Sequence, residues 1–200
     1  MKFENRVFVS VKVAVETSVL FEKIRAEIEG SGDSKAFLRR ELPRVRNLRR
    51  RYIFVVYESV LGELIGQIYT KVDNVEIFRA VDKAIQFIIA DINAEIIRTR
   101  CGRTVLRIFN ELMELEWDND VTWGMDIYDM WHCSQILSDD SCAILWTKDR
   151  RMLNSSVLRS SSGLQEKLIR NGIRHRPLQV VDTLKNGAVQ IRGNLYMSGV

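Results

Sequence analysis

The stretch that decides the fold is DMWHCSQILSDDSCAILWTKDRRM, which runs from Asp129 to Met152. It opens with an acid and an amphipathic helical pattern, passes a short loop, and reaches the apolar run CAILW, which is typical of a buried strand. A second acid, Asp149, follows that strand. Because a helix and the strand after it can pack together, this stretch predicts an α/β unit in which two carboxylates distant in sequence can meet.

Strands and helices also alternate on both sides of this stretch. The valine-rich segment 6–15 predicts a buried strand, and the segment 16–29 predicts a helix with Thr17 or Ser18 as its N-cap. The segment YIFVVY, at 52–57, is a short strand or the lead-in to the helix that follows it. The other expected elements are helices at 35–51, through most of 75–116, at 127–137 and at 162–173, and strands at 142–147, 178–184 and 188–197.

This order of elements predicts an α/β domain with a largely parallel central sheet. The length of 200 residues suits one hydrophobic core, so we expect a single domain over 1–200. It would carry a helical elaboration at about 75–116 and a C-terminal strand pair at about 178–198. The KNG sequence between the last two strands predicts a tight turn, and the resulting β-hairpin would make the sheet mixed.

The composition is that of a globular protein, with 46% hydrophobic and 28% charged residues and a net charge of +4. Cys101, Cys133 and Cys142 form no CxxC pair, which argues against a zinc ribbon or a disulfide framework. Lys12 and Glu16 interrupt the apolar run near the N-terminus, so neither a signal peptide nor a membrane span is expected. We therefore expect a cytoplasmic protein that does not enter the membrane.

Four acids are predicted to gather at one end of the sheet. Ligand sites in parallel sheets lie outside the carboxyl ends of the strands. Glu16 ends the first strand, and Asp149 follows the strand CAILWT. Glu63 and Asp129 each lie early in a helix. Four carboxylates in one cleft would repel one another without a cation, and oxygen ligands favour Mg²⁺ or Mn²⁺.

The motifs around these acids resemble those of the PIN-domain (PilT N-terminus-like) nuclease family. The stretch from Asp129 resembles the family's helix of the type D-x-x-H, followed by a loop, an apolar strand and T-x-D. VAVETSVLFEKI resembles the opening strand and turn, D-T-[NS]-x-L, and SVLGELIGQIY is similar to the V-x-x-E-[LIV] helix. The three motifs occur in the family's order and frame the chain from about Val7 to about Thr183.

The resemblance implies a three-layer α/β/α fold and a metal-dependent endoribonuclease that cleaves RNA phosphodiester bonds. Asp129 and Asp149 match the family's metal-binding acids, and Glu63 matches its central acid. Thr147 matches the hydroxyl residue that supports the site. With Glu16, these acids are the expected catalytic and metal-binding set for Mg²⁺ or Mn²⁺, which would activate a water and stabilise the leaving group.

Glu16 departs from the family pattern, which has Asp at this position. The extra methylene moves the carboxylate by about 1.5 Å, and the near-octahedral geometry of Mg²⁺ tolerates displacement poorly. The alternative function is therefore a catalytically impaired PIN-like module that binds nucleic acid or protein. Glu16 can also be an acid favoured by a helix N-terminus. Glu58 competes with Glu63, which we prefer because it lies within the apolar frame VLGELI.

Other polar residues near the site have structural explanations beside the functional ones. Asp126, three residues before Asp129, either caps the helix or supports the site as an extra ligand. His132 is expected to be a packed helix residue, because the family does not use this histidine in catalysis. Asp139 and Asp140 are expected to lie in a solvated loop.

A basic block suggests an RNA path, although it can equally be a solvated helix face or bind a protein. Lys148, Arg150 and Arg151 stand beside the proposed site. The block comprises Arg39, Arg40, Arg44, Arg46, Arg49, Arg50 and Arg51. Expected partners are RNA, a second copy of the chain in a homodimer, and a protein such as an antitoxin. The homodimer is expected from the apolar residues Ile85, Phe87, Ile88, Ile89, Ile92 and Ile96.

Overall fold

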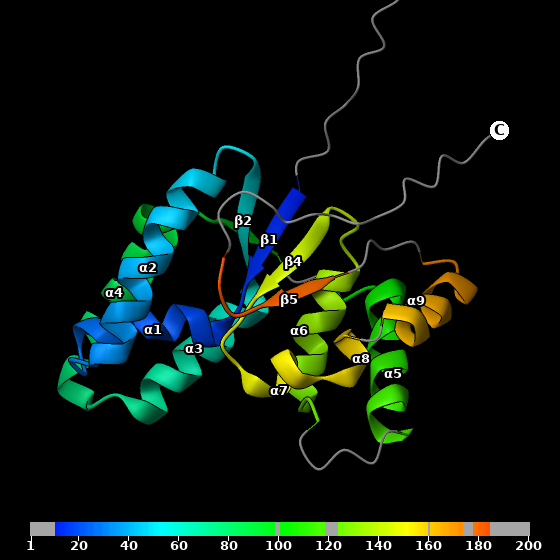
Figure 1. The fold of residues 1–200 in the computed structure, drawn as a ribbon. Coiled ribbons are helices and arrows are strands. Elements are labelled where there is room, and N and C mark those ends of the chain that lie inside the picture. Colours follow the sequence, from blue (N-terminus) through cyan, green and yellow to red (C-terminus); the bar gives the residue numbers. More distant parts are fainter. Residues whose placement is uncertain (1–10, 99–100, 119–123, 160, 174–177, 185–200) are drawn as a thin grey trace, which may run out of the picture.

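The structure, a computed structural model, describes residues 11–98, 101–118, 124–159, 161–173 and 178–184. Its centre is a sheet of five parallel strands in the order β3-β2-β1-β4-β5 (Figure 1). The strands are β1 (Val11–Val15), β2 (Tyr52–Tyr57), β3 (Glu95–Ile97), β4 (Cys142–Trp146) and β5 (Gln179–Val181). The predicted α/β fold with a largely parallel sheet is therefore confirmed.

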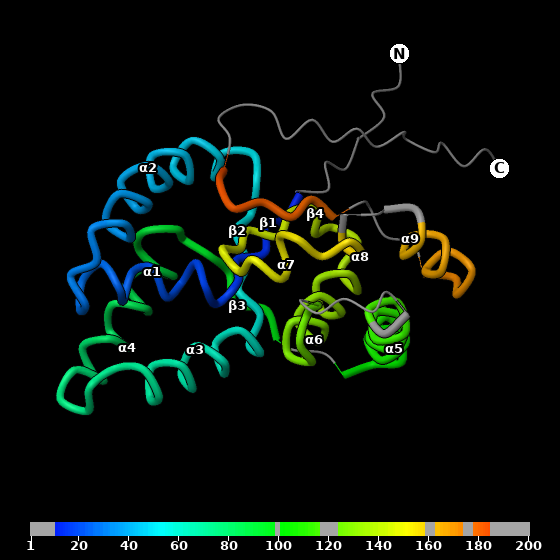
Figure 2. The backbone as a smooth tube through the Cα atoms, turned by 60° about the horizontal axis from the view of Figure 1, so that its bottom comes forward, coloured from blue at the N-terminus to red at the C-terminus, as the bar shows by residue number. Residues whose placement is uncertain are grey.

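Helices cover both faces of this sheet and give the predicted three layers. Figure 2 shows α1 to α4 on one side of the strands and α5, α6 and α9 on the other. The first group comprises α1 (Thr17–Glu27), α2 (Gly32–Leu48), α3 (Glu58–Lys71), the 3₁₀ turn η1 (Asn74–Glu76), α4 (Ile77–Gln86) and the π-turn η2 (Phe87–Asp91). The second comprises α5 (Arg103–Asp118), α6 (Ile127–Leu137) and α9 (Ser161–Arg170), and the short helices α7 (Arg150–Asn154) and α8 (Ser156–Arg159) follow β4.

The two central strands are apolar because both of their faces are covered. β1 pairs with β2 through Val13 and Phe54, and with β4 through Val13 and Ile144. Every residue of β4 is buried, as expected for a parallel strand between two helical layers. Trp146 at the end of β4 is fully buried, and its ring lies 6.0 Å from that of Phe37 on α2. This contact fixes α2 against the carboxyl end of β4.

Two sequence predictions about local structure were wrong. The helical pattern was expected to continue through residues 95–97, but the chain leaves the helix at Asn93, whose φ is 51°, and forms β3. The N-cap of α1 is Glu16 rather than Thr17 or Ser18, because the Glu16 side chain accepts a hydrogen bond from the Ser18 backbone.

Several other expectations have clear outcomes. The segment 52–57 is a strand, and α2 begins at Gly32 with Pro43 inside it. Helices α7 and α8 were not predicted. The expected hairpin at about 178–198 lies mostly outside the described residues. In the described part of this segment, 178–184, the strand is β5. Among the helices that the structure describes, none is long and apolar enough to span a membrane.

Candidate functional site

Four chain segments meet where the strands end and place the predicted acids there (Figure 1). Glu16 joins β1 to α1, and Glu63 lies in the second turn of α3, which directly follows β2. Asp129 lies in the first turn of α6, and Asp149 joins β4 to α7. A parallel sheet brings these positions to the same end of the molecule, as expected for a ligand site in this class of fold.

Glu16 is a buried acid that serves as a helix cap. Only 4% of the residue is exposed. The carboxylate oxygen Oε2 accepts hydrogen bonds from the Ser18 amide at 2.9 Å, from the Thr147 hydroxyl at 2.8 Å and from the Ser18 hydroxyl. Burial raises the pKa of Glu16, the bonds from Ser18 and Thr147 oppose that rise, and the charge of Glu63 adds to it. Glu16 therefore has the structural role considered for it, that of an acid at the N-terminus of a helix.

Glu63 points into the site, whereas Glu58 is exposed at the start of α3. Its Oε2 accepts a hydrogen bond from the Thr17 hydroxyl at 2.7 Å, and its Oε1 accepts one from the Gln67 amide at 2.8 Å. Thr17 immediately follows Glu16, so this contact links the acid of α3 to the start of α1. The contacts favour Glu63 over Glu58 as the acid at this position.

His132 is packed beneath the site. It is 3% exposed, and burial lowers its pKa. Its Nδ1 lies 3.4 Å from the Glu63 carboxylate, but the atom makes no hydrogen bond, so the pair is a close contact. This agrees with the expectation that His132 is a packed helix residue.

Asp126 and Asp129 form a reciprocal cap at the start of α6. The Asp126 carboxylate accepts from the amides of Tyr128 and Asp129, each at 2.9 Å, and the Asp129 carboxylate accepts from the Asp126 amide at 3.1 Å. Burial raises the pKa of Asp129 to about 7, with further contributions from the charges of Asp126 and Asp149. The hydrogen bond from Asp126 and the charge of Arg151 act in the opposite direction.

Thr147 connects two of the acids. Its hydroxyl donates to Glu16 and accepts a hydrogen bond from the Asp149 amide at 2.9 Å. Asp149 in turn caps α7 by accepting from the Arg151 amide at 2.7 Å. The hydroxyl therefore fixes the backbone that carries Asp149 relative to the end of β1, as the predicted supporting role requires.

Arg151 was predicted to contact RNA, but its guanidinium lies among the acids. Its nitrogens are 2.6 Å from Asp126, 3.2 Å from Asp129 and 3.0 Å from Asp149. Asp129 and Asp149 both contact the same nitrogen, Nη2. Carboxylates from α6 and from the β4–α7 junction therefore converge on one cationic group.

The acids do not form a single ligand cluster in this arrangement. In the part of the chain that the structure describes, no three His, Cys, Asp or Glu side chains are grouped so that they could hold a metal ion. Asp129 and Asp149 both contact Arg151, whereas Glu16 and Glu63 lie near enough for the charge of Glu63 to raise the pKa of Glu16. The donor set still has suitable chemistry for a hard cation, because carboxylate oxygens from separate elements already enclose a positive charge. A common ion for all four acids stays a prediction.

Lys148 is a second basic residue beside the site, and it is held by contacts with α1 and α2. Its ammonium group lies 3.0 Å from the buried carboxylate of Glu22 and 4.6 Å from the centre of the Phe37 ring. Arg150, two residues further on, is exposed. These two cations flank the acids on the side of β4.

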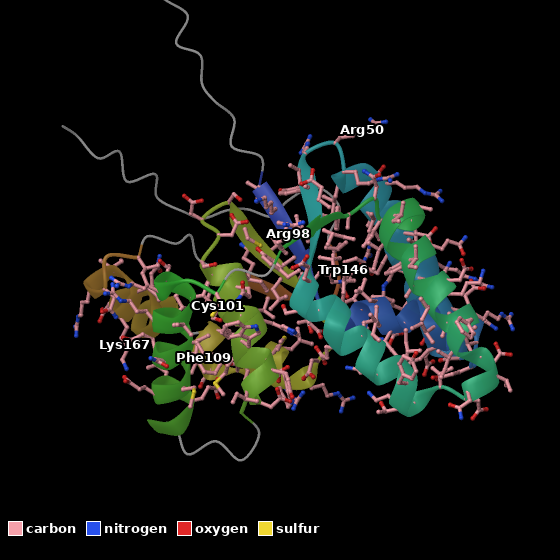
Figure 3. All side chains as sticks on the ribbon, turned by 180° about the vertical axis from the view of Figure 1, so that it is seen from behind. Arg50, Arg98, Cys101, Phe109, Trp146 and Lys167 are labelled. Atoms are coloured by element: carbon pink, nitrogen blue, oxygen red, sulfur yellow. The ribbon has the colours of Figure 1, made fainter. Side chains whose placement is uncertain are left out.

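The basic block of α2 is divided between different environments. Arg40 and Arg44 each lie 2.8 Å from the buried carboxylate of Glu41, so part of their charge is neutralised. Arg39 and Arg46 line an open cleft of about 430 Å³ between α1 and α2. Figure 3 shows Arg50 at the end of the sheet where β2 begins, opposite the strand ends that carry the acids. The block as a whole therefore does not line one path to the site.

Some contacts at the site were not predicted from the sequence. Thr17 and Gln67 bind Glu63, and the spacing of Gln67, four residues after Glu63 on one helix, is the signal that would have found it. Asp139 was assigned to a solvated loop, but it is half-buried and pairs with Lys12 at 2.7 Å. That assignment was wrong for Asp139, because the loop folds back onto β1, whereas Asp140 is exposed.

Comparison with models of known protein families gave no match, and comparison with curated proteins gave none either. Among solved structures, the chain is similar to VapBC2 from Rickettsia felis bound to a DNA fragment from its promoter. The TM-score is 0.49 with 14% sequence identity, over 73% of this chain and 94% of that chain. A likeness at this level says nothing about activity.

Proposed function

We propose that this chain is a PIN-like endoribonuclease that depends on Mg²⁺ or Mn²⁺. The observation that supports it most is the convergence of Asp129 and Asp149 on one cationic nitrogen at the carboxyl end of a parallel sheet. Neighbouring carboxylates from separate elements repel one another, so such an arrangement favours a positively charged occupant. The order of motifs in the sequence supports the same function.

In this proposal each acid has a distinct role. Asp129, Asp149 and Glu63 would hold the ion, which when bound polarises a phosphodiester and lowers the pKa of a water. Glu16 is a positioning residue, because its carboxylate holds the Thr147 hydroxyl, and that hydroxyl holds the Asp149 backbone. Glu16 and Asp129 are buried, so their carboxylates are largely shielded from bulk water.

The proposed substrate is RNA, whose phosphates would contact the cations next to the acids. Lys148 is preorganised for this role by Glu22 and Phe37, and Arg150 is exposed beside it. Such contacts give affinity without base choice, and they weaken as salt rises. Arg39, Arg40 and Arg44 would extend the basic surface along α2, with Arg40 and Arg44 weakened by their pairing to Glu41.

The function is tested by incubating the purified chain with a mixed single-stranded RNA pool and Mn²⁺. Asp129→Asn and Asp149→Asn are expected to lower the cleavage rate by roughly a hundredfold or more, since each removes a charge that acts on the transition state. Asp140→Asn is the matched control, because it removes an exposed carboxylate of the same type, and its rate should stay near wild type. Cleavage that persists in Asp149→Asn or without divalent ions contradicts the proposal.

The second candidate is a PIN-like module that binds RNA or a protein such as an antitoxin without cleaving. It is favoured by the observation that Glu16 caps a helix and that Arg151 lies among Asp126, Asp129 and Asp149. In the same experiment, retained RNA on the protein with no Mn²⁺-dependent products supports this module and rejects the nuclease.

A further inference from the structure

The position of Arg151 has a consequence for how the acids accept a metal ion. Its guanidinium is in contact with three carboxylates that belong to two chain segments, the start of α6 and the start of α7. Nη1 pairs with Asp126, while Nη2 pairs with both Asp129 and Asp149. Arg151 is therefore the shared counter-ion of this acid group.

The same oxygen atoms would be needed to hold a divalent ion. The Oδ2 atoms of Asp129 and Asp149 both approach Nη2, and Asp129 is almost fully buried, with 7% of its side chain exposed. A second cation placed at these oxygens would lie within a few ångströms of the guanidinium, where two positive charges repel each other strongly. Asp129 and Asp149 can therefore bind either the guanidinium or a divalent ion strongly, but not both at once.

The guanidinium can leave without disturbing the helix that carries it. The Arg151 amide, not the side chain, makes the capping hydrogen bond to Asp149, so α7 keeps its first turn when the side chain rotates. The side chain is 39% exposed, which gives it a direct route to solvent. Its long, flexible stem permits such a rotation, which costs the ion pairs with the three carboxylates.

We propose that Arg151 is an internal competitor of the metal ion, a positioning residue that must release Asp129 and Asp149 before a divalent cation binds. This inference rests on the proposed function, because it concerns the same acids. Arg151 sets the metal concentration at which the site fills, and the protein binds divalent ions more weakly than its acids alone would.

Arg150 provides a matched control for this inference. It is adjacent to Arg151, carries the same charge and is exposed, and within the described residues it has no ion pair with a carboxylate. Replacing either arginine by glutamine changes the net charge of the chain equally. A difference between the two variants therefore reports the contacts of Arg151 and not the overall charge.

The experiment measures Mn²⁺ binding to the full chain, without RNA, by isothermal titration and by the paramagnetic resonance signal of free Mn²⁺. Arg151→Gln is expected to bind Mn²⁺ roughly tenfold more tightly than wild type or better, and Arg150→Gln within about twofold of wild type, since only the former removes a charge at the oxygens. Equal affinity in all three proteins, or weaker binding by Arg151→Gln, overturns the inference.

Two further outcomes separate this inference from the proposed function. If wild type binds Mn²⁺ and Arg151→Gln binds it no better, the inference fails while the proposed metal site stands. If none of the proteins binds Mn²⁺ at millimolar concentration, the proposed metal dependence fails and the inference falls with it. Arg151→Lys serves if the glutamine variant does not fold, because a single ammonium group cannot bridge three carboxylates. An affinity for Arg151→Lys equal to wild type also overturns the inference.

Discussion

At the scale of the residue, Glu16 combines a structural and a proposed functional role. One carboxylate oxygen accepts hydrogen bonds from two residues, Ser18 and Thr147, and so fixes both the start of α1 and the hydroxyl beside Asp149. The Glu16 side chain extends from the end of β1 to Thr147, which follows the neighbouring strand β4. Glu16 therefore joins the start of α1 to the segment that carries Asp149.

Replacing Glu16 should therefore lower stability by removing these acceptors. Glu16→Ala is expected to lower the free energy of unfolding by about 1–2 kcal/mol, because it removes a helix cap and the acceptor of the buried Thr147 hydroxyl. Glu16→Gln keeps a side-chain oxygen acceptor of the same length and should cost less. Urea unfolding of the three proteins gives these values. A Glu16→Ala protein as stable as wild type would show that the cap contributes nothing.

Asp129 predicts a pH dependence of stability whose sign follows from its raised pKa. The folded carboxyl has a pKa of about 7, against 3.8 as its ordinary value, so between these pH values the folded state holds a proton that the unfolded state has released. The free energy of unfolding then falls as pH rises through this window. Asp129→Asn removes the titrating group, so its stability relative to wild type should increase between pH 5 and about pH 7.

Urea unfolding at a series of pH values measures this difference. Asp140→Asn is the control, because its carboxyl is exposed, and its stability relative to wild type should change little with pH. A constant difference between Asp129→Asn and wild type across the series would mean that burial does not raise the pKa of Asp129.

At the scale of the element, Asn93 decides where a helical pattern gives way to a strand. Its φ of 51° lies in the left-handed region, which asparagine and glycine adopt more readily than other residues. Asn93→Gly is expected to retain or raise stability, while Asn93→Ala should lower it by about 1 kcal/mol through strain. Thermal unfolding separates the two variants, and the exposed position of Asn93 limits other effects. Equal losses in both would show that the side chain of Asn93, not its backbone angle, matters.

The same segment shows why some elements could be predicted from the sequence and others could not. The unit from α6 to β4 has a capped helix, a polar loop and an apolar strand, so period and local signals agree. In β3, the isoleucines Ile96 and Ile97 continue the helical period of the preceding residues, and pairing with β2 overrides it. Asn93 was the local signal for the break. Helices α7 and α8 have five and four residues, which is too short for a periodic pattern.

At the scale of the whole molecule, the sequence located the candidate site but not its internal contacts. Parallel strands bring their carboxyl ends together, so acids that follow strands or begin the connecting helices could be placed at one end of the sheet. The pairing of Arg151 with Asp126 depends on how α7 packs against α6, and no sequence period encodes that contact. The convergence of Asp129 and Asp149 on Arg151 depends on the same packing.

The expected homodimer stays a prediction, and the exposed apolar residues indicate which surface would form it. Of the apolar residues that suggested it, Phe87, Ile88 and Ile92 belong to the core, while Ile85, Ile89 and Ile96 are exposed. Exposed apolar residues also lie on α3 and α4, which contact each other. We call the exposed apolar residues of α3, α4 and η2 the α3–α4 surface, which comprises Ile65, Tyr69, Phe78, Ile85 and Ile89.

We expect this α3–α4 surface to form the two-fold contact of a homodimer, because exposed apolar patches commonly mark interfaces. Phe78 is 88% exposed, so Phe78→Glu removes an apolar contact without disturbing the core. In a symmetric interface it also brings two negative charges together, which repel each other. Light scattering at micromolar concentration should give the dimer mass for wild type and the monomer mass for Phe78→Glu. Ile169→Glu is the matched control, since Ile169 is exposed on α9 and should leave the dimer intact. A wild-type protein that stays monomeric, or equal loss of the dimer in both variants, would contradict this assignment.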